Sequence, residues 1–351
     1  MFSAKGYRMP AEWEPQSGVQ LTWPHAGTDW APMLDDIILT YRQMALEISR
    51  RERLLVVAPE GGAPGMLYVV CPTNDTWARD HGFITLVSRE AGMPPLLMDF
   101  QFNGWGGKFP AELDNAINRR LYDSGELMGS YVSQLDFVLE GGSIESDGCG
   151  SIFTTTQCLM APGRNEPMTQ DQIEQRLKQV LGAERVVWID HGRLTGDDTD
   201  GHIDTLVRVC PDDTLLYVGC DDRQDEQYEE LQLMEEQLHT LRTMDGRPYR
   251  LRRLPMPRPI YDNEQGSMSK VPCDRLPATY ANFLVINGAV LCPTYGQPDL
   301  DAEALTTIGQ AFPDRDIVGI DCRSIIRQHG SLHCCTMQFP EGALKVESTH
   351  V

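Results

Sequence analysis

Long apolar runs are missing from this sequence. No stretch approaches the ~20 consecutive apolar residues that a membrane-spanning helix needs. The opening residues, MFSAKGYRMP, lack the apolar core of a secretory signal. The ten cysteines include no C-x-x-C pair, which argues against zinc ribbons and thioredoxin-like redox sites. We therefore expect a cytoplasmic protein without a disulfide framework and without a membrane partner.

Basic residues are few compared with acidic ones. Lys and Arg number 30 against 51 Asp and Glu, a formal net charge of −21. Such a chain repels nucleic-acid phosphates and favours small cationic molecules. No G-x-G-x-x-G follows a predicted strand, and G-x-x-x-x-G-K-[ST] is absent, so nucleotide-dependent chemistry is excluded as well.

Turn-joined apolar runs alternate with amphipathic segments along the chain. The pattern predicts strands at 17–24 and 331–340 and hairpins at 82–100, 141–155, 202–219 and 282–296. It predicts helices at 34–51, 111–123, 169–181, 226–244 and 301–312. Short strands such as 184–189 and 316–320 follow helices. A hairpin–helix–strand unit thus recurs about five times, which favours one α/β domain over 1–351. The Pro-rich stretch 253–280 is predicted to be a long loop, either a binding loop or an insertion.

Two stretches place acids beside glycine or an aromatic residue at strand boundaries. TNDTWARDHG (73–82) gathers Trp77, Asp80 and neighbouring charges just before an apolar strand. This suits the mouth of a site, although a salt-bridged turn would look the same. VLEGGSI (138–144) ends an apolar run on Glu140 before two glycines, which allow close backbone approach. A β-bulge with an incidental acid is the alternative.

A third stretch, TGDDTDGHIDTLVRV (195–209), surrounds one histidine with aspartates. It lacks the D-x-D-x-D-G spacing and the later Glu of an EF-hand, so we reject a calcium loop. If it forms a strand, His202 and Asp204 share a face and could handle a proton together. The alternative is a surface histidine without a chemical role, whose ring already has its hydrogen-bond partners.

The fourth stretch, HGSLHCCTMQF (329–339), contains two adjacent thiols, Cys334 and Cys335. On a strand they would face opposite sides, so one would be catalytic or ligating and the other would belong to the core. Their spacing alone does not say which.

Together these residues suit chemistry on a guanidinium group. A thiol with a histidine partner fits acyl or amidine transfer. A protease or thioesterase has little use for several acids near the thiol, whereas a guanidinium pairs with carboxylates through its planar N–H fork. A non-catalytic binder of guanidines or polyamines and a cysteine protease or transglutaminase are the competing classes.

Six stretches appear in an order that resembles the agmatine deiminase family, within the guanidine-modifying pentein superfamily and also described as bacterial peptidyl-arginine deiminases. They are RMPAEWEPQSGVQLTWP, NDTWARDHG, VLEGGSIESDG, DDTDGHID, YANFLVINGAVLCPTYG and GSLHCCTMQ, spanning about residues 7–340. The resemblance implies a five-bladed α/β propeller. It also implies hydrolysis of agmatine to N-carbamoylputrescine and ammonia, in putrescine and polyamine biosynthesis. Deimination of peptidyl-arginine or free arginine to citrulline is the alternative within the family.

The resemblance also implies roles by position. Cys334, which directly follows the histidine of the last motif, would be the nucleophile, and Cys335 the buried neighbour. His202 would be the general acid and base, and Glu140 would pair with it. Asp80 and Asp204 would hold the guanidinium.

Trp77 would line the substrate channel, and the implied reaction needs no metal or cofactor. The oligomeric state stays open, with a homo-oligomer as one option. Two departures from the family pattern concern the active-site loops. QHGSLHCC has one glycine and a serine where a glycine run and an asparagine are usual, and Phe83 replaces a proline.

Overall fold

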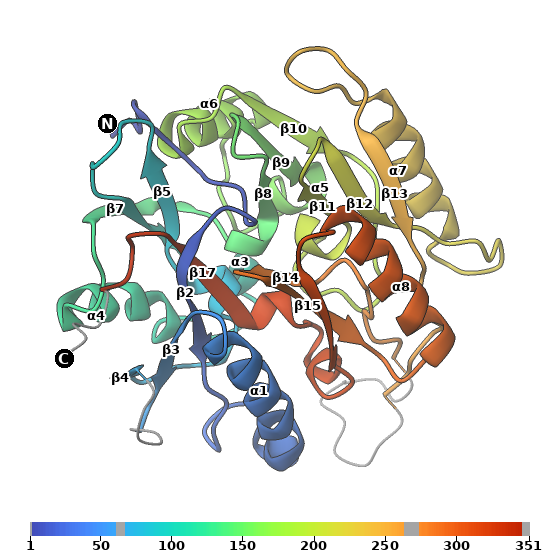
Figure 1. Cartoon of the computed structure of the whole chain (residues 1–351), viewed down its shortest axis with the longest axis horizontal. Coiled ribbons are helices and arrows are strands. Elements are labelled where there is room, and N and C mark those ends of the chain that lie inside the picture. Colours follow the sequence, from blue (N-terminus) through green and yellow to red (C-terminus); the bar gives the residue numbers. More distant parts are fainter. Residues whose placement is uncertain (1, 61–66, 263–273, 346–351) are drawn as a thin grey trace.

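The strands of the molecule form small sheets rather than one large sheet. The computed structural model describes residues 2–60, 67–262 and 274–345. Within these ranges there are five sheets, and Figure 1 shows them following one another around the middle of the molecule. No helix in the described part of the chain has both the length and the apolar character needed to cross a membrane. Of the predicted loop 253–280, residues 263–273 lie outside the described ranges.

Each sheet contains the same three-strand unit. Two strands pair antiparallel, a helix follows, and the third strand pairs parallel with the second. A helical crossover is the usual way to join neighbouring parallel strands. Four of the units run in chain order. The first two are β5 (Ile84–Ser88), β6 (Leu96–Gln101), α4 (Ile117–Ser124) and β7 (Ser130–Val138), followed by β8 (Ile144–Ser146), β9 (Ser151–Thr155), α6 (Gln170–Leu181) and β10 (Arg185–Ile189). The next two are β11 (Val207–Cys210), β12 (Thr214–Val218), α7 (Tyr228–Thr240) and β13 (Arg250–Leu254), followed by β14 (Leu284–Ile286), β15 (Ala289–Thr294), α8 (Pro298–Ala311) and β16 (Asp316–Asp321).

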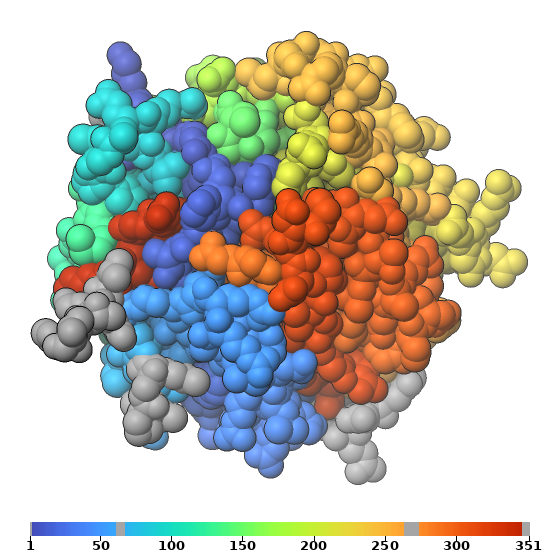
Figure 2. All heavy atoms as spheres, in the orientation of Figure 1, coloured from blue at the N-terminus to red at the C-terminus, as the bar shows by residue number. Residues whose placement is uncertain are grey.

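The fifth unit joins the two ends of the chain. Its first strand is β17 (Thr336–Pro340), which pairs antiparallel with β2 (Gln16–Thr22); α1 (Leu34–Ser49) and β3 (Arg53–Ala58) complete it. Figure 2 shows the two ends side by side, the red C-terminal part against the dark blue N-terminal part. Two short edge strands, β1 (Tyr7–Arg8) and β4 (Leu67–Val70), extend β5 and β3. The hydrogen bonds between β17 and β2 thereby hold the two ends of the chain together.

Local signals account for the helices and hairpins that the sequence predicts. All five predicted helices are confirmed, although α4 begins only at Ile117, after the 3-10 turn η2 (Asp114–Ala116), and so starts later than the predicted 111. In α6, Thr169 and Gln172 form a capping box, and Gly182 ends the helix at φ 66. The apolar side chains of α6 are buried, and each stabilises the fold by roughly 1.5–3 kcal/mol. They are Ile173, Leu177, Val180 and Leu181. The hairpin at Asn287-Gly288 is confirmed too, with Gly288 at φ 73.

Two strand predictions at the candidate site were wrong. Residues 202–204 and 332–335 do not belong to strands, because β11 begins only at Val207 and β17 only at Thr336. The preceding residues form single 3-10 turns, η4 (Ile203–Thr205) and η6 (His333–Cys335). The alternation of faces along a strand therefore does not apply to His202 and Asp204, nor to the two cysteines.

Candidate active site

Short helical turns stand just before the first strand of four units. They are α2 (Ala78–His81) before β5, η3 (Gly141–Ser143) before β8, η4 before β11 and η6 before β17. These turns contact one another, α2 with η3 and η6, and η3 with η4. Asp80, Glu140, His202 and Cys334 lie in or next to these turns. The remaining unit, that of β14, contributes Asn282, two residues before this strand. The repeated architecture thus brings one polar side chain from each unit to the middle of the molecule.

Hydroxyl groups close three of these turns in the same way. Ser143 donates to the carbonyl of Glu140 (2.6 Å), Thr205 to that of His202 (2.8 Å) and Thr336 to that of His333 (2.9 Å). A hydroxyl bonded three residues back competes with strand pairing. This contact explains why the chain turns at these positions before the strand begins.

A cavity of about 390 Å³ opens onto these turns. Of the residues predicted from the sequence, Trp77, Asp80 and Cys334 line it. Glu140, His202 and Asp204 lie behind them, each with no exposed surface. Two further aromatic residues, Trp105 and Phe109, also line the cavity, and Trp77 and Trp105 meet edge to face, with ring centroids 6.4 Å apart. The cavity therefore has aromatic walls and a polar closed end.

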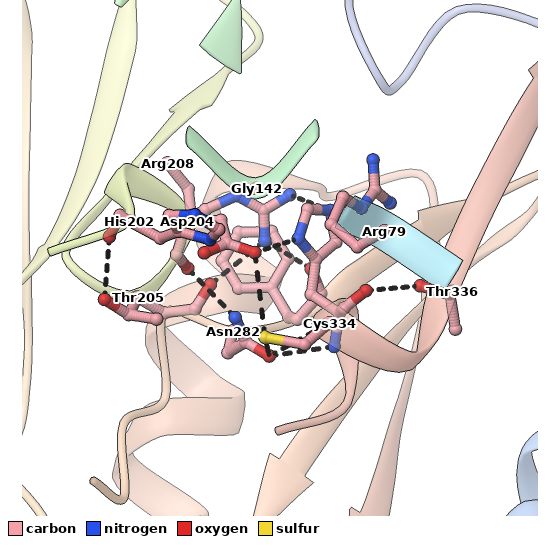
Figure 3. Close-up of polar contacts among 12 residues, drawn as sticks. Arg79, Gly142, His202, Asp204, Thr205, Arg208, Asn282, Cys334 and Thr336 are labelled. Atoms are coloured by element: carbon pink, nitrogen blue, oxygen red, sulfur yellow. Dashed lines mark hydrogen bonds and ion pairs between the residues drawn. The ribbon is translucent and has the colours of Figure 1, made fainter. Parts of the chain in front are cut away.

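The thiol of Cys334 lies at the closed end. Its Sγ is 3.4 Å from Asn282 Oδ1 and 4.0 Å from Asp204 Oδ2, as the dashed lines in Figure 3 mark. Asn282 Oδ1 also accepts from the backbone N–H of His333 (2.9 Å) and of Cys334 (3.3 Å). Burial raises the pKa of the Cys334 thiol well above its usual value, and Asp204 and Asp80 raise it further. The thiol is therefore protonated in the empty site.

His202 and Asp80 form the charged pair of the site. His202 Nδ1 lies 3.6 Å from Asp80 Oδ1. Burial alone would lower the pKa of His202, but Asp80, Cys158 and Glu140 outweigh it and raise that pKa to about 10. Burial raises the pKa of Asp80 to about 6, although His202 opposes the shift. At neutral pH the pair is an imidazolium beside a carboxylate.

The partners of Asp204 and Glu140 differ from those expected. Asp204 Oδ2 lies 2.7 Å from Nδ1 of His333, so the histidine that hydrogen-bonds to it is His333, while His202 acts on it through charge alone. Glu140 accepts from Arg164 Nε at 3.1 and 3.3 Å, and that ion pair has no exposed side-chain surface. The ring of His202 makes no hydrogen bond of its own within the described residues. Glu140 acts on it through charge at a short distance rather than through a direct bond.

Comparison with known proteins decides the family. The model of the Porphyromonas-type peptidyl-arginine deiminase family matches residues 8–340. The chain belongs to this family. A provisionally assigned arginine deiminase from Porphyromonas gingivalis is 47% identical, with a TM-score of 0.88 and coverage of 97% of this chain and 100% of that one. A cysteine-to-serine variant of agmatine deiminase from C. jejuni, solved with substrate bound, is 35% identical, with a TM-score of 0.86 and 97% coverage of both chains. Agmatine deiminase from Medicago truncatula is 32% identical over 95% of this chain and 96% of the plant protein.

Several residues of this family member's site escaped the sequence reasoning. Trp105 donates from Nε1 to Asp80 Oδ2 (2.9 Å), and its backbone is left-handed at φ 56, which is rare outside glycine. Asn282 holds the Cys334 turn. Arg164 neutralises Glu140. The YANF stretch contained Asn282, but no pattern within it distinguishes a site asparagine from a turn residue.

Two groups of described residues could offer three ligand atoms within 4.8 Å of one another. They are Glu140, Cys158 and His202, and Glu12, Glu145 and His333. Arg164 already pairs with a carboxylate of the first group, and Arg208 with both carboxylates of the second. The guanidinium groups of the protein itself thus neutralise these acids. That the reaction needs no metal stays a prediction.

Gly142 marks the point where the family member's charged groups converge. A Cβ added there would lie 2.6 Å from His202 Nδ1, 2.9 Å from Asp80 Oδ1 and 3.2 Å from Asp204 Oδ2. The backbone N–H of Gly142 also donates to Asp80 Oδ1 (3.1 Å). Only glycine leaves room for all three side chains around this backbone.

We expect Gly142→Ala to lower the rate of ammonia release by about 100-fold or more, because a 1 Å displacement of reacting groups has that effect. Steady-state rates with a guanidine substrate would test this. Gly309→Ala in α8 is the control, because its Cβ would come no nearer than 3.3 Å to a neighbouring side chain, that of Ile317. Equal activity in the two variants would contradict the convergence of charged groups at Gly142.

Proposed function

We propose that the protein is an agmatine deiminase, which hydrolyses agmatine to N-carbamoylputrescine and ammonia and so feeds putrescine biosynthesis. One observation carries the proposal. A buried thiol, an imidazolium and two carboxylates meet at the closed end of a cavity whose described lining includes five aspartates but no Lys or Arg. A long cation with a guanidinium at one end and an ammonium at the other matches that distribution of charge.

The proposed reaction assigns each side chain a step. Asp80 and Asp204 accept N–H groups of the guanidinium and keep its central carbon electrophilic. The Cys334 thiolate attacks this carbon and forms a C–S bond. His202, as imidazolium, gives its proton to one NH₂ group, which leaves as ammonia, and a covalent thiouronium remains. Neutral His202 then takes a proton from water as the water oxygen bonds to the carbon. The C–S bond breaks, the remaining hydroxyl proton leaves for solvent, the thiolate returns and the ureido product leaves.

The substrate itself supplies the charge that activates the thiol. Before substrate binds, burial and then Asp204 and Asp80 hold the pKa of Cys334 high. A bound guanidinium places a positive charge beside the sulfur and these carboxylates, which favours the thiolate. The thiol proton leaves for solvent as the substrate enters. We infer that the nucleophile forms only when there is a substrate to attack.

The acidic lining favours agmatine over arginine. Asp29, Asp75, Asp198 and Asp274 line the cavity besides Asp80. An α-carboxylate would meet these acids with no Lys or Arg among the described lining residues to receive it, whereas the ammonium of agmatine would be attracted. Formation of citrulline from peptidyl or free arginine is the second candidate. The 47% identity to the P. gingivalis protein favours it.

Ammonia release from agmatine, free arginine and an arginine-containing peptide would test the proposal. We expect activity on agmatine to exceed that on arginine by about 100-fold or more, since desolvating a carboxylate beside like charges costs several kcal/mol. Higher activity on arginine or on the peptide would support deimination but would assign a different substrate to the protein. Inactivity on all three would refute deimination by this protein.

Further expectations remain proposals. We propose that the five sheets are the blades of an α/β propeller, since each repeats the same unit and the fifth joins the two chain ends. That shared sheet also supports a single domain over residues 1–351. A cytoplasmic location stays a prediction from the sequence.

A further inference from the structure

A histidine with unusual backbone geometry stands at the edge of the cavity. His329 follows the 3-10 turn η5 (Ile325–Gln328), lines the cavity and has a φ of 64°. Left-handed backbone is uncommon for a residue other than glycine, asparagine or aspartate, and it costs of order 1–3 kcal/mol where it occurs. The imidazole is held at this edge despite that cost.

The imidazole of His329 clamps the loop that leads to His202. Its Nδ1 lies 2.7 Å from the carbonyl oxygen of Gly196. A carbonyl only accepts, so Nδ1 carries a proton whether the ring is neutral or charged. Gly196 is fixed from its other side, because a Cβ there would meet the carbonyl of Arg275 at 2.2 Å. With Nδ1 engaged, Nε2 is the ring atom left for a ligand, an acceptor when neutral and a donor when protonated.

Charged groups around the imidazole come from several segments. Asp198, on the clamped loop, has Oδ2 4.0 Å from His329 Nδ1 and also lines the cavity. Lys108 binds the backbone carbonyl of Asp198 and the carboxylate of Asp200, so its charge points to that loop as well. Asp29, Asp75 and Asp274 line the same cavity, and Arg327 lies within η5, with Nε 3.7 Å from Asp262 Oδ1. Acids therefore dominate the surroundings.

His329 lies nearer the solvent than the nucleophile does. Its side chain is 19% exposed, whereas Cys334 is 3% exposed. A substrate with its guanidinium at Cys334 extends its chain past the aromatic walls toward this outer edge. Its distal ammonium then reaches the region of Asp198 and His329.

We propose that His329 is a specificity-determining residue: in its neutral form, Nε2 accepts a hydrogen bond from the distal ammonium of agmatine beside Asp198. This inference rests on the proposed function. The distal amine is thereby recognised by a group remote from the reacting carbon.

The test compares agmatine with 1-butylguanidine, which lacks the distal amine. At pH 8, the ratio of KM for agmatine to KM for butylguanidine should be about tenfold higher in His329→Asn than in the wild type, as for the loss of one hydrogen bond to a charged group. The ratio cancels effects on the guanidinium end, which both substrates share. The asparagine amide tolerates left-handed backbone and can donate to Gly196, but it places no imidazole Nε2 at the cavity edge.

A second variant and a control complete the design. His329→Gly relieves the backbone strain and removes the imidazole, so its ratio should also rise about tenfold. His239→Asn, at an exposed histidine of α7, should behave as the wild type. A ratio that is unchanged in both His329 variants would overturn the inference while deimination stands. No ammonia from either substrate in the wild type would overturn the proposed function and this inference with it.

Discussion

Replacing Cys334 by alanine should abolish ammonia release from agmatine, by about 10⁴-fold or more, because loss of a nucleophile removes the covalent route altogether. The sulfur is positioned for attack, 3.4 Å from Asn282 and 4.0 Å from Asp204 at the closed end of the cavity. The side chain is small and lies at a cavity wall. We therefore expect the free energy of unfolding to change by about 1 kcal/mol or less.

The adjacent cysteine provides the matched control. Cys335 has no exposed surface, and it is not among the residues that line the cavity. Burial raises the pKa of its thiol to about 12, although Tyr41 partly opposes the shift, so it is a poor nucleophile. Cys335→Ala should keep most of the activity and lose about 1 kcal/mol of stability through the cavity it leaves.

Mass spectrometry separates the two thiols directly. Acid-quenched wild type and Cys335→Ala should each carry the substrate-derived thiouronium adduct, and Cys334→Ala should carry none. Turnover that survives in Cys334→Ala would mean that another group attacks the guanidinium, and the adduct site would then identify it.

The sequence predicted most of the elements because their signals are local. Thr169, Gln172 and Gly182 mark both ends of α6 within the helix itself. Asn287 and Gly288 fix their hairpin within four residues. Repetition of such local units was enough to predict the hairpin–helix–strand order, and the resemblance to a known family supplied the candidate residues.

Contacts between the units could not be predicted in this way. The strand alternation used for His202 and for the two cysteines fails, because hydroxyl bonds from Thr205 and Thr336 turn the chain before the strand starts. The partner of Asp204 is His333, 129 residues away. The residue pattern of one segment says nothing about the other segment. Contacts such as that between Asp204 and His333 are therefore set by how the units pack, which the sequence pattern does not show.

The buried charges around Arg208 are the clearest example of such packing. Arg208 lies on β11 and is 1% exposed. Its guanidinium contacts Glu145 Oε1 (2.6 Å), Glu12 Oε2 (2.9 Å), His333 Nε2 (3.2 Å) and the carbonyls of Ala281 and Phe283. It thereby joins the N-terminal segment, two of the sheets and the turn that holds Cys334. Glu12 and Arg208 are 196 residues apart in the sequence.

We expect Arg208→Met to lower the free energy of unfolding by about 3–5 kcal/mol, since it leaves Glu145 buried without its hydrogen-bonded cation and leaves Glu12 with only His333 (2.8 Å) and the more distant Arg79 (4.0 Å). Denaturant titration should show a lower midpoint with an unchanged slope. Arg258→Met is the control, because its bidentate pair with Asp299 is more than half exposed on both sides, so solvent screens the pair and its loss should hardly change the stability. Equal losses in the two variants would mean that burial adds nothing to the Arg208 network.

The pH dependence of this loss distinguishes charge from packing. Burial raises the pKa of Glu145, and Arg208 opposes that shift, so the pKa should rise further in Arg208→Met. Between the unfolded and the raised folded pKa, the folded variant binds more protons than the unfolded chain, and its stability increases as the pH falls. The deficit relative to the wild type should therefore be smaller at pH 5 than at pH 8. A deficit independent of pH would instead assign the loss to packing, including the contact of Arg208 with the Phe283 ring at 4.3 Å.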